Sequence, residues 1–410
     1  MKKSSSFSGS LGFVLAAAGS AVGVGNIWRF PYLCAKDGGG LFLLIYLVLV
    51  LTFGFTLLTT DVAIGRRTKQ NALNAFATLN KKWRFLGYLT FLVPTLIMTY
   101  YSVIGGWITK YFTLYLVSSG DAAAQDGFFT SFITSPVSPI VFMLLFLALT
   151  AWVVYCGVEK GIEKFSRYIM PGLLLLIIGI AIFSLTLSYT DESGVTRTGM
   201  EGFLVYIKPD FTGLTVPRFL NIVLDAMSQL FFSLSVSMGI MITYGSYTGK
   251  EVNLVRSTAM ICIFDTLVAL IAGLAIFPSV AHFDPALLGS SKGVALMFII
   301  LPQVFESMGG VGQVVSFAFF VMVDIAAITS VVSLIEVVTQ FVIQKFHAHR
   351  KRAALIVAGV CFLVSIPIGI SLGHVAILEE ASPALFGLDW LTFFDEVTNT
   401  VLMPVCALFS

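Results

Sequence analysis

Charged residues are scarce in this chain. Asp, Glu, Lys and Arg make up 11% of the 410 residues, whereas hydrophobic residues make up 57%. Soluble globular domains carry about 25% charged residues. A chain with so little charge cannot cover a surface that faces water, and it must use lipid as its solvent. The composition therefore excludes a soluble protein and predicts an all-α membrane protein.

Cysteine is also sparse, and no constellation of catalytic residues stands out. The five cysteines lie singly in apolar runs, and none forms a Cys-x-x-Cys pair. This spacing favours buried small hydrophobic residues over a disulfide framework or a metal site. Because the sequence holds no nucleophile–base pair and no metal-ligand cluster, we expect neither an enzyme nor a bound organic cofactor.

The few basic residues are distributed unevenly. Lys and Arg collect at the N-terminus and in alternate loops, whereas the loop Ser118–Pro139 has none. By the positive-inside rule, the N-terminus and the basic loops are expected to be cytoplasmic. The loop Ser118–Pro139 is short and has no Asn-x-Ser/Thr site. We therefore expect a multi-pass protein of a bacterial inner membrane.

Long apolar runs predict about ten membrane spans, since a bilayer core needs roughly 20 apolar residues per helix. A short amphipathic helix is expected at 66–85, and an outer hairpin with its own apolar run at 284–308. The last span stops at Ser410 while still apolar, so this helix is expected to be truncated. The predicted spans are 11–35, 41–64, 87–117, 139–157, 168–189, 221–248, 257–280, 314–344, 353–372 and 391–410.

The first and sixth spans each carry small and polar residues where the middle of the bilayer is expected. Such residues make a poor continuous helix, and they occupy corresponding places in two five-span halves, 1–190 and 191–410. This pairing predicts discontinuous helices in an inverted repeat, with a binding site between the breaks. Close packing of helices through small residues is the alternative. The residues concerned are Gly19, Ser20, Gly23, Gly25 and Asn26 in the first span and Ser233, Ser235, Ser237 and Gly239 in the sixth.

The string AGSAVGVGNIWRFPYLCAKDGGG, at Ala18–Gly40, closely resembles the first-helix signature of the neurotransmitter:sodium symporter family. A second match is SQLFFSLSVSMG, at Ser228–Gly239, and the resemblance extends over the whole chain. It implies the LeuT-type fold, a 5+5 inverted repeat with a discontinuous first and sixth helix. It also implies a symporter that imports an amino acid or amine into the cell together with sodium.

Two sodium sites are implied by the resemblance, and both use the oxygen ligands that a hard cation prefers. One site would use the carbonyl groups of Gly19, Val22 and Ala326 and the hydroxyl groups of Thr329 and Ser330. Without the resemblance, these two hydroxyls would be expected to bond to their own helix. The other site would use Ala21, Asn26, Ser233, Asp265 and the carboxylate of the substrate.

The resemblance also implies the substrate class. Amine transporters of the family carry Asp where this chain has Gly23, and glycine leaves room for an α-carboxylate that meets backbone N–H groups. The expected substrate is therefore a hydrophobic or aromatic α-amino acid, held in an uncharged pocket. The substrate-binding residues implied are Ala21, Gly23, Gly25, Ile97, Tyr101, Phe232, Ser233, Ser235, Met238, Ser330 and Leu334.

Three further acidic or basic residues have implied or expected roles. Asp265 lies inside an apolar helix and is expected to supply the negative charge that chloride supplies in many relatives, which predicts transport without chloride. Arg29 and Asp395 are implied as the outer gate.

Two alternatives to a symporter remain: a sensor or receptor that binds the same ligand without transporting it, and an inactive truncated fragment.

Overall fold

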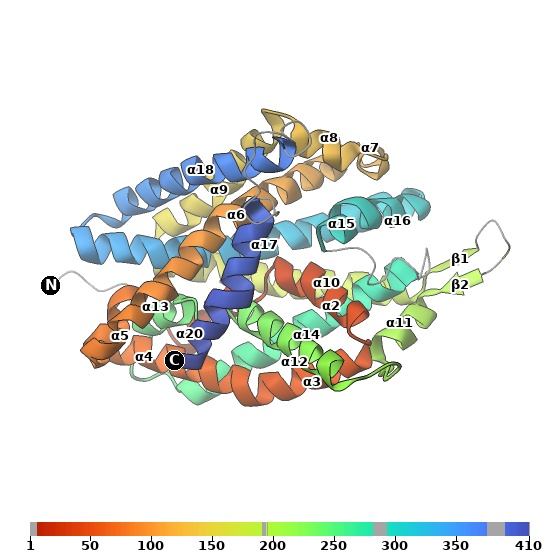
Figure 1. The fold of residues 1–410 in the computed structure, drawn as a ribbon. Helices are drawn as coiled ribbons and strands as arrows, with labels where there is room; N and C mark the ends of the chain where they lie inside the picture. Colours follow the sequence, from red (N-terminus) through yellow and green to blue (C-terminus); the bar gives the residue numbers. More distant parts are fainter. Residues whose placement is uncertain (1–5, 191–193, 195, 282–292, 375–389, 410) are drawn as a thin grey trace.

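The computed structural model describes all residues except 1–5, 191–193, 195, 282–292, 375–389 and 410. Within this part of the chain the protein is a bundle of long helices with one small hairpin at its edge (Figure 1). The hairpin consists of β1 (Ser188–Thr190) and β2 (Thr196–Thr198), which pair antiparallel with Ser188 opposite Thr198. The prediction of an all-α membrane protein is confirmed.

The first half of the chain begins with α1 (Ser10–Ala21), the π-helical turn η1 (Gly25–Arg29) and α2 (Phe30–Lys36). The helices that follow are α3 (Gly40–Leu49), η2 (Val50–Gly54), α4 (Phe55–Thr68), α5 (Ala72–Leu79), η3 (Lys81–Trp83), α6 (Arg84–Leu116), α7 (Asp121–Ala124), α8 (Phe128–Thr134), α9 (Ser138–Cys156), η4 (Val158–Glu163) and α10 (Lys164–Leu185).

The second half has a matching number of long elements. Its helices are α11 (Gly199–Ile207), α12 (Val216–Ser233), α13 (Ile240–Ser246), α14 (Leu254–Ala281), α15 (Gly293–Ala295), η6 (Leu296–Ile300), α16 (Leu301–Ser307), α17 (Gly310–Phe346), α18 (Arg350–His374), α19 (Trp390–Glu396), η7 (Val397–Leu402) and α20 (Met403–Phe409).

The spans agree with the predicted set in their two breaks, although in the part of the chain that the structure describes fewer than the predicted ten pass as membrane-length apolar helices. Among the described residues, eight continuous helical segments are long and apolar enough to cross a membrane, and α1 and the segment Gly25–Lys36 form a ninth span bent by 53°. The sixth predicted span, 221–248, is divided into α12 and α13 by a non-helical segment at 234–239. Both predicted discontinuous helices are therefore present.

Two long helices occupy the middle of the bundle. The apolar windows of the segments Lys81–Leu116 and Gly310–Phe346 are each 78% buried, a larger share than in any other continuous span. These are α6, with its short lead-in η3, and α17, which pack against each other (Figure 1). These two central helices are apolar but mostly covered by other helices, so they can hold residues of a binding site in place. The peripheral spans expose one face to lipid.

Three predicted boundaries were wrong. The fifth span was expected to begin at 168, but helix begins with η4 at Val158 and continues through Pro171. The charged residues between 158 and 168 led us to predict a loop there. A helix that extends beyond the apolar core of the membrane can carry charged side chains and still keep its backbone hydrogen bonds. The amphipathic helix expected at 66–85 is shorter, since α4 extends to Thr68 and α5 starts only after the N-cap Asn71.

The outer segments contain structure that the sequence pattern did not indicate. The hairpin β1–β2 and the helix α11 lie around the connection between the predicted spans 168–189 and 221–248, for which the sequence predicted no regular structure. The apolar run expected to form an outer hairpin is helical from Gly293 to Ser307, and the preceding residues of that segment lie outside the described part.

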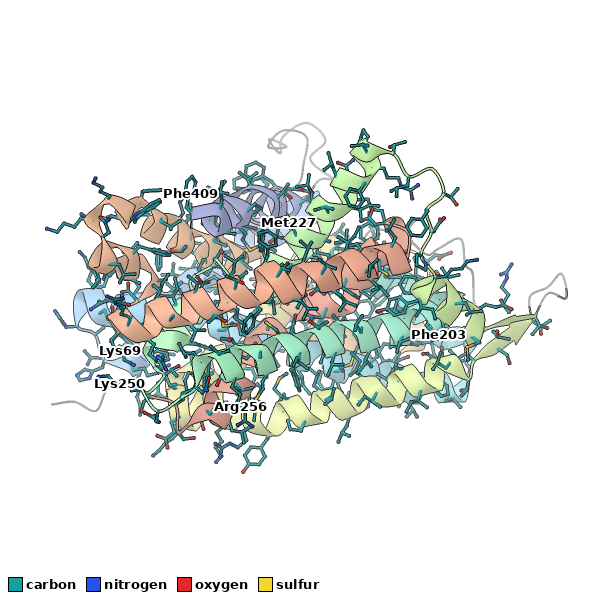
Figure 2. The ribbon with its side chains drawn as sticks, turned by 90° about the horizontal axis from the view of Figure 1, so that it is seen from below. Lys69, Phe203, Met227, Lys250, Arg256 and Phe409 are labelled. Atoms are coloured by element: carbon teal, nitrogen blue, oxygen red, sulfur yellow. The ribbon has the colours of Figure 1, made fainter. Side chains whose placement is uncertain are left out.

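One end of the bundle is basic. Lys69, Lys250 and Arg256 lie together at this end, and Phe203 lies at the opposite end (Figure 2). Lys69 donates hydrogen bonds to the carbonyls of Ser246 and Thr248 at 3.1 and 2.6 Å, which joins the ends of α4 and α13 there. We refer to this as the basic end.

Candidate functional site

The first break exposes backbone groups at Val22–Val24. The N–H of Gly23 donates to Asn26 Oδ1 at 3.1 Å, and the N–H of Val24 donates to the hydroxyl of Tyr101 at 3.0 Å. The segment is buried. Unwound backbone inside a membrane is tolerated only where protein or a cavity satisfies it, and here side chains of the same site do so.

The second break is held in a conformation that is unusual for its residues. Ser235 and Ser237 have φ values of 53° and 62°, a region that residues other than glycine rarely adopt. Asp61 is an acidic residue within the second predicted span, and its place near the cytoplasmic end of that span predicts a hydrogen bond to the broken sixth helix. It accepts from the N–H of Ser237 at 2.9 Å, which stabilises this backbone. Ser235 Oγ donates to the carbonyl of Ser20 at 3.1 Å, so the two breaks contact each other directly.

Three fully buried side chains from three elements meet beside the first break. Asn26 Nδ2 donates to Asp265 Oδ1 at 2.8 Å and to Ser233 Oγ at 3.0 Å. Ser233 Oγ in turn donates to the Asp265 carboxylate, with 2.8 Å to Oδ2. The structure thus brings together Asn26, Ser233 and Asp265, side chains implied as ligands of one sodium site. All three offer oxygen atoms, as a hard cation requires.

Sequence reasoning missed two neighbours of this cluster. Gln229 is fully buried, donates to the carbonyl of Gly25 at 3.3 Å, and keeps its Oε1 without a partner among the described residues. The fully buried Tyr46 places its hydroxyl beside Ser233 and Asp265. Gln229 lies one helical turn before Ser233, which is the signal that could have identified it; Tyr46 gave no local signal.

The other implied sodium ligands lie where α1 crosses α17. A Cβ atom on Gly19 would stand 3.5 Å from Thr329 Cβ, so the backbone of the first helix lies directly against Thr329. Thr329 Oγ1 donates to the carbonyls of Ile325 and Ala326, and Ser330 Oγ lies 3.4 Å from the carbonyl of Ser20. Ser166 of α10 also faces this point, 3.3 Å from the same position, and was not predicted.

A small pocket lies between the two breaks and the central helices. No residue that lines it is charged. Of the predicted substrate-binding residues, nine line it: Ala21, Gly23, Ile97, Tyr101, Phe232, Ser235, Met238, Ser330 and Leu334; Ser20, Asn26, Ile240 and Ser333 line it as well. Ser333, bonded to Ser20 Oγ at 2.7 Å, could have been identified from its position three residues after Ser330.

Two predicted pocket residues lie outside this lining. Ser233 turns away from it toward Asp265. Gly25 lies under the Phe232 ring, where a Cβ atom would be 2.6 Å from the ring, and it lines an adjoining cavity. The absence of a side chain at Gly25 therefore allows Phe232 to cover the pocket.

The adjoining outer cavity has a volume of about 530 Å³ and is bounded by Arg29, Tyr101, Phe232 and Asp395, among others. Arg29 donates to Ser228 Oγ at 2.9 Å, and its guanidinium lies 5.9 Å from the centre of the Phe232 ring. Asp395 accepts from Asn399 at 2.6 Å. Arg29 and Asp395, the two residues implied as the outer gate, line the same cavity but form no ion pair with each other. Ser228 and Asn399 are instead the hydrogen-bond partners of Arg29 and Asp395.

A second polar network lies toward the basic end. Tyr247 donates to the wholly buried Glu336, which also forms an ion pair with Arg350. Phe7 packs edge-on against Tyr247 and donates its N–H to the Tyr247 carbonyl at 3.3 Å. The network joins the N-terminal segment to α13, α17 and α18. By the resemblance, Ser4 and Gln344 occupy the positions of an inner gate, where the sequence indicates no charged pair. Gln344 accepts from the N–H of Asn71, and Ser4 lies outside the described residues.

Replacing Arg350 with Gln should lower the free energy of unfolding by roughly 3–5 kcal/mol, because it leaves the carboxylate of Glu336 buried without its cation. Unfolding in detergent followed by circular dichroism measures the loss. Arg256→Gln, an exposed change at the same end, should stay within about 0.5 kcal/mol. The double variant Glu336→Gln/Arg350→Gln should recover much of the stability. If Arg350→Gln matched the Arg256→Gln control, the ion pair would not stabilise the fold.

Two unwound helices that face each other around a small central pocket, inside a bundle of membrane-length helices, define a secondary transporter. The sequence comparisons give the family. The model of the sodium:neurotransmitter symporter family matches residues 4–120 and 131–409. The chain belongs to this family.

Individual relatives agree with this assignment. A sodium-dependent transporter of Bacillus subtilis (strain 168) is 37% identical over 407 residues, which cover 97% of this chain and 84% of the relative. The human sodium- and chloride-dependent GABA transporter 2 is 26% identical over 87% of this chain and 65% of its own length. The solved structure of MhsT in complex with L-phenylalanine superposes with a TM-score of 0.86 at 36% identity, over 98% of this chain and 88% of that one.

Several expectations from the sequence are thereby confirmed. The protein has the LeuT-type fold, and it is a multi-pass membrane protein of a sodium-dependent symporter family. This is a family of transporters and not of enzymes. Sodium is accordingly the coupling ion that membership in the family implies.

Proposed function

We propose that this chain imports a hydrophobic or aromatic α-amino acid, driven by two sodium ions that move with it. The observation that carries the proposal is Gly23. A Cβ atom there would lie 2.7 Å from Ser330 Oγ and 3.1 Å from the Tyr101 hydroxyl, so only glycine leaves room for a small polar group of a substrate. The N–H groups of Gly23 and Val24 and the Tyr101 hydroxyl surround that space, and donors of this kind are suited to a carboxylate.

The opposite side of the pocket supports an apolar side chain. Ile97, Met238 and Leu334 line it, and each is at most 3% exposed. Because the pocket has no charged wall, an acidic or basic side chain would be buried there without a partner, which is costly. Methionine adapts its shape readily, which suits bulky ligands. The likeness to MhsT, whose structure holds L-phenylalanine, supports the same substrate class.

Transport of the substrate would be coupled to sodium through the attraction between the substrate carboxylate and a bound sodium ion. A substrate carboxylate at Gly23 would lie beside Asn26, whose Oδ1 already accepts from the Gly23 N–H. A sodium ion between Ala21, Asn26, Ser233 and Asp265 would then neutralise both carboxylates. The second ion would lie between α1 and α17, held by the carbonyls of Gly19, Val22 and Ala326 and the hydroxyls of Thr329 and Ser330.

The two halves, 1–190 and 191–410, would move relative to each other, with Arg29 and Asp395 closing the outer cavity above Phe232. Since Lys69, Lys250 and Arg256 mark the basic end, we assign that end and the N-terminus to the cytoplasm of a cell whose inner membrane holds the protein.

Uptake by purified protein in liposomes tests the proposal. With sodium outside, labelled Leu, Phe, Tyr or Trp should accumulate at least tenfold over liposomes that have equal sodium on both sides. Glu and Lys should not compete for uptake. Binding of the same amino acids without uptake or counterflow would instead identify a sensor, and neither binding nor uptake would identify an inactive fragment. A preference for Glu or Lys would contradict the assigned pocket.

A further inference from the structure

A groove runs between the outer faces of α9 and α18, which lie side by side at the edge of the bundle (Figure 1). It has a volume of about 400 Å³ and is far from the pocket between the breaks. Its lining residues recur at helical spacing on each side. They are Leu144, Leu147, Ala148, Ala151, Trp152 and Tyr155 of α9 and Leu355, Ala358, Gly359 and Phe362 of α18.

Small residues give the groove its depth. Ala148 and Ala151 on one side oppose Ala358 and Gly359 on the other, where larger side chains would fill the space between the helices. At Gly359 an added Cβ atom would meet no other atom within 4 Å, so this part of the groove is open. The mainly apolar lining suits a hydrocarbon chain, which gains dispersion contacts along its length.

The mouth of the groove at the basic end carries two cations. Lys351 and Arg352 precede Leu355 by four and three residues, which places them on the same stripe of α18 as the lining residues. Both are exposed. Lys351 Nζ lies 5.0 Å from the centre of the Tyr155 ring, across the mouth of the groove.

The adjacent Arg350 is not available to a ligand, because it is used within the protein. Its guanidinium pairs with Glu336, and its Nε donates to the carbonyl of Val154 at 3.1 Å. The second contact fixes the start of α18 to the end of α9. Of the three consecutive basic residues 350–352, Arg350 is thus used within the protein, whereas Lys351 and Arg352 are exposed and can contact a ligand.

We propose that this groove is a binding site for an anionic phospholipid of the leaflet at the basic end. One acyl chain lies in the groove, and the phosphate group lies between Lys351 and Arg352. Basic residues where two membrane helices meet the interface attract anionic headgroups, each with an effect of roughly fivefold in affinity. Charge complementarity at the mouth and an apolar floor directly beneath it distinguish this site from the general lipid boundary.

Trp152 is a reporter inside the site, since it lines the groove and is 60% exposed. Lipids that carry bromine on the acyl chain quench tryptophan on contact, and the Trp152→Phe variant identifies the part of the signal that comes from this residue. In mixed vesicles, brominated phosphatidylglycerol should quench Trp152 at a concentration at least fivefold lower than brominated phosphatidylcholine. Inorganic phosphate at millimolar concentration should not relieve the quenching.

Two variants test the two parts of the site. Lys351→Gln/Arg352→Gln should remove the preference for the anionic lipid, whereas Lys250→Gln/Arg256→Gln, at the same end of the bundle, should keep it. Gly359→Leu should fill the groove and reduce quenching by both lipids at least threefold. The matched control is Gly179→Leu on α10, where an added Cβ atom also meets nothing within 4 Å.

Equal quenching by the two lipids in the unmodified protein would overturn the proposal, because it would mean ordinary boundary lipid. So would a preference that survives Lys351→Gln/Arg352→Gln. If a second copy of the chain covered the groove, Trp152 would be insensitive to either lipid and cross-linking would give dimers, and the proposal would fail as well. Sodium-driven uptake can be intact in each of these cases, so the result does not depend on the proposed transport function.

Discussion

Gly23→Ala should weaken binding of the transported amino acid by roughly ten- to a hundredfold. The added methyl group would lie 2.7 Å from Ser330 Oγ and 3.1 Å from the Tyr101 hydroxyl. Tyr101 accepts from the N–H of Val24 and Ser330 Oγ lies against the carbonyl of Ser20, so neither can withdraw without disturbing the backbone of the first helix. The methyl group would therefore occupy the space that we assign to the substrate carboxylate.

Equilibrium binding of labelled amino acid to purified protein measures the effect, and a thermal unfolding curve shows whether the variant folds. Gly179→Ala is the matched control, because it adds the same methyl group to a membrane helix at an open position. Tyr101→Phe provides a second test of the same space, since it removes the hydroxyl and adds no bulk; it should weaken binding by a smaller factor. Unchanged affinity in a folded Gly23→Ala protein would mean that the carboxylate binds elsewhere.

Asp265→Asn should lower the affinity for sodium on the order of a hundredfold and stop sodium-driven uptake at ordinary concentrations. A unit charge about 4 Å from a cation contributes up to roughly 4 kcal/mol at a dielectric constant near 20. The amide removes this charge. It also presents an N–H₂ group to Asn26 and Ser233, both of which donate to the carboxylate in the native protein.

The same residue predicts how transport responds to chloride. If Asp265 supplies the negative charge that chloride would otherwise supply, the unmodified protein should take up substrate equally well in chloride and in gluconate. Sodium binding and uptake in the two salts measure both expectations. Asp324→Asn is the matched control: it removes another carboxylate from a membrane helix, one that accepts from Thr109 at 3.0 Å and lies outside the site. A strict chloride requirement in the unmodified protein would refute the role assigned to Asp265.

The break residues illustrate how far the sequence could be interpreted. Ser235 and Ser237 stood out because polar residues in the middle of an apolar run are costly, and the structure places both in a non-helical segment. Asp61 and Asp265 stood out for the same reason, and both accept hydrogen bonds from residues at the breaks. Residues of this kind can be found from the sequence because a polar or charged residue within an apolar membrane span is rare.

Other parts of the site had no such signal. Tyr46 and Gln229 are polar, but one belongs to a long apolar helix and the other to a mixed one, and only packing brings them to Asp265 and Gly25. Arg29 and Asp395 were paired on a resemblance. The structure gives each of them a different hydrogen-bond partner, Ser228 for Arg29 and Asn399 for Asp395, although both line the same cavity.

The sequence by itself determined that this is a membrane protein, that its first and sixth helices are discontinuous, and which small and polar residues lie at the breaks. These properties follow from the free-energy cost of placing charged or polar groups in hydrocarbon. That cost depends on the residue itself and not on its neighbours in space. The tertiary structure alone decided that the breaks touch through Ser20 and Ser235, and that Gly23 has no room for a side chain. It also decided that α9 and α18 leave a groove beneath Lys351. Those features depend on distances between segments that are far apart in the sequence, and such distances are set by packing and not by local composition.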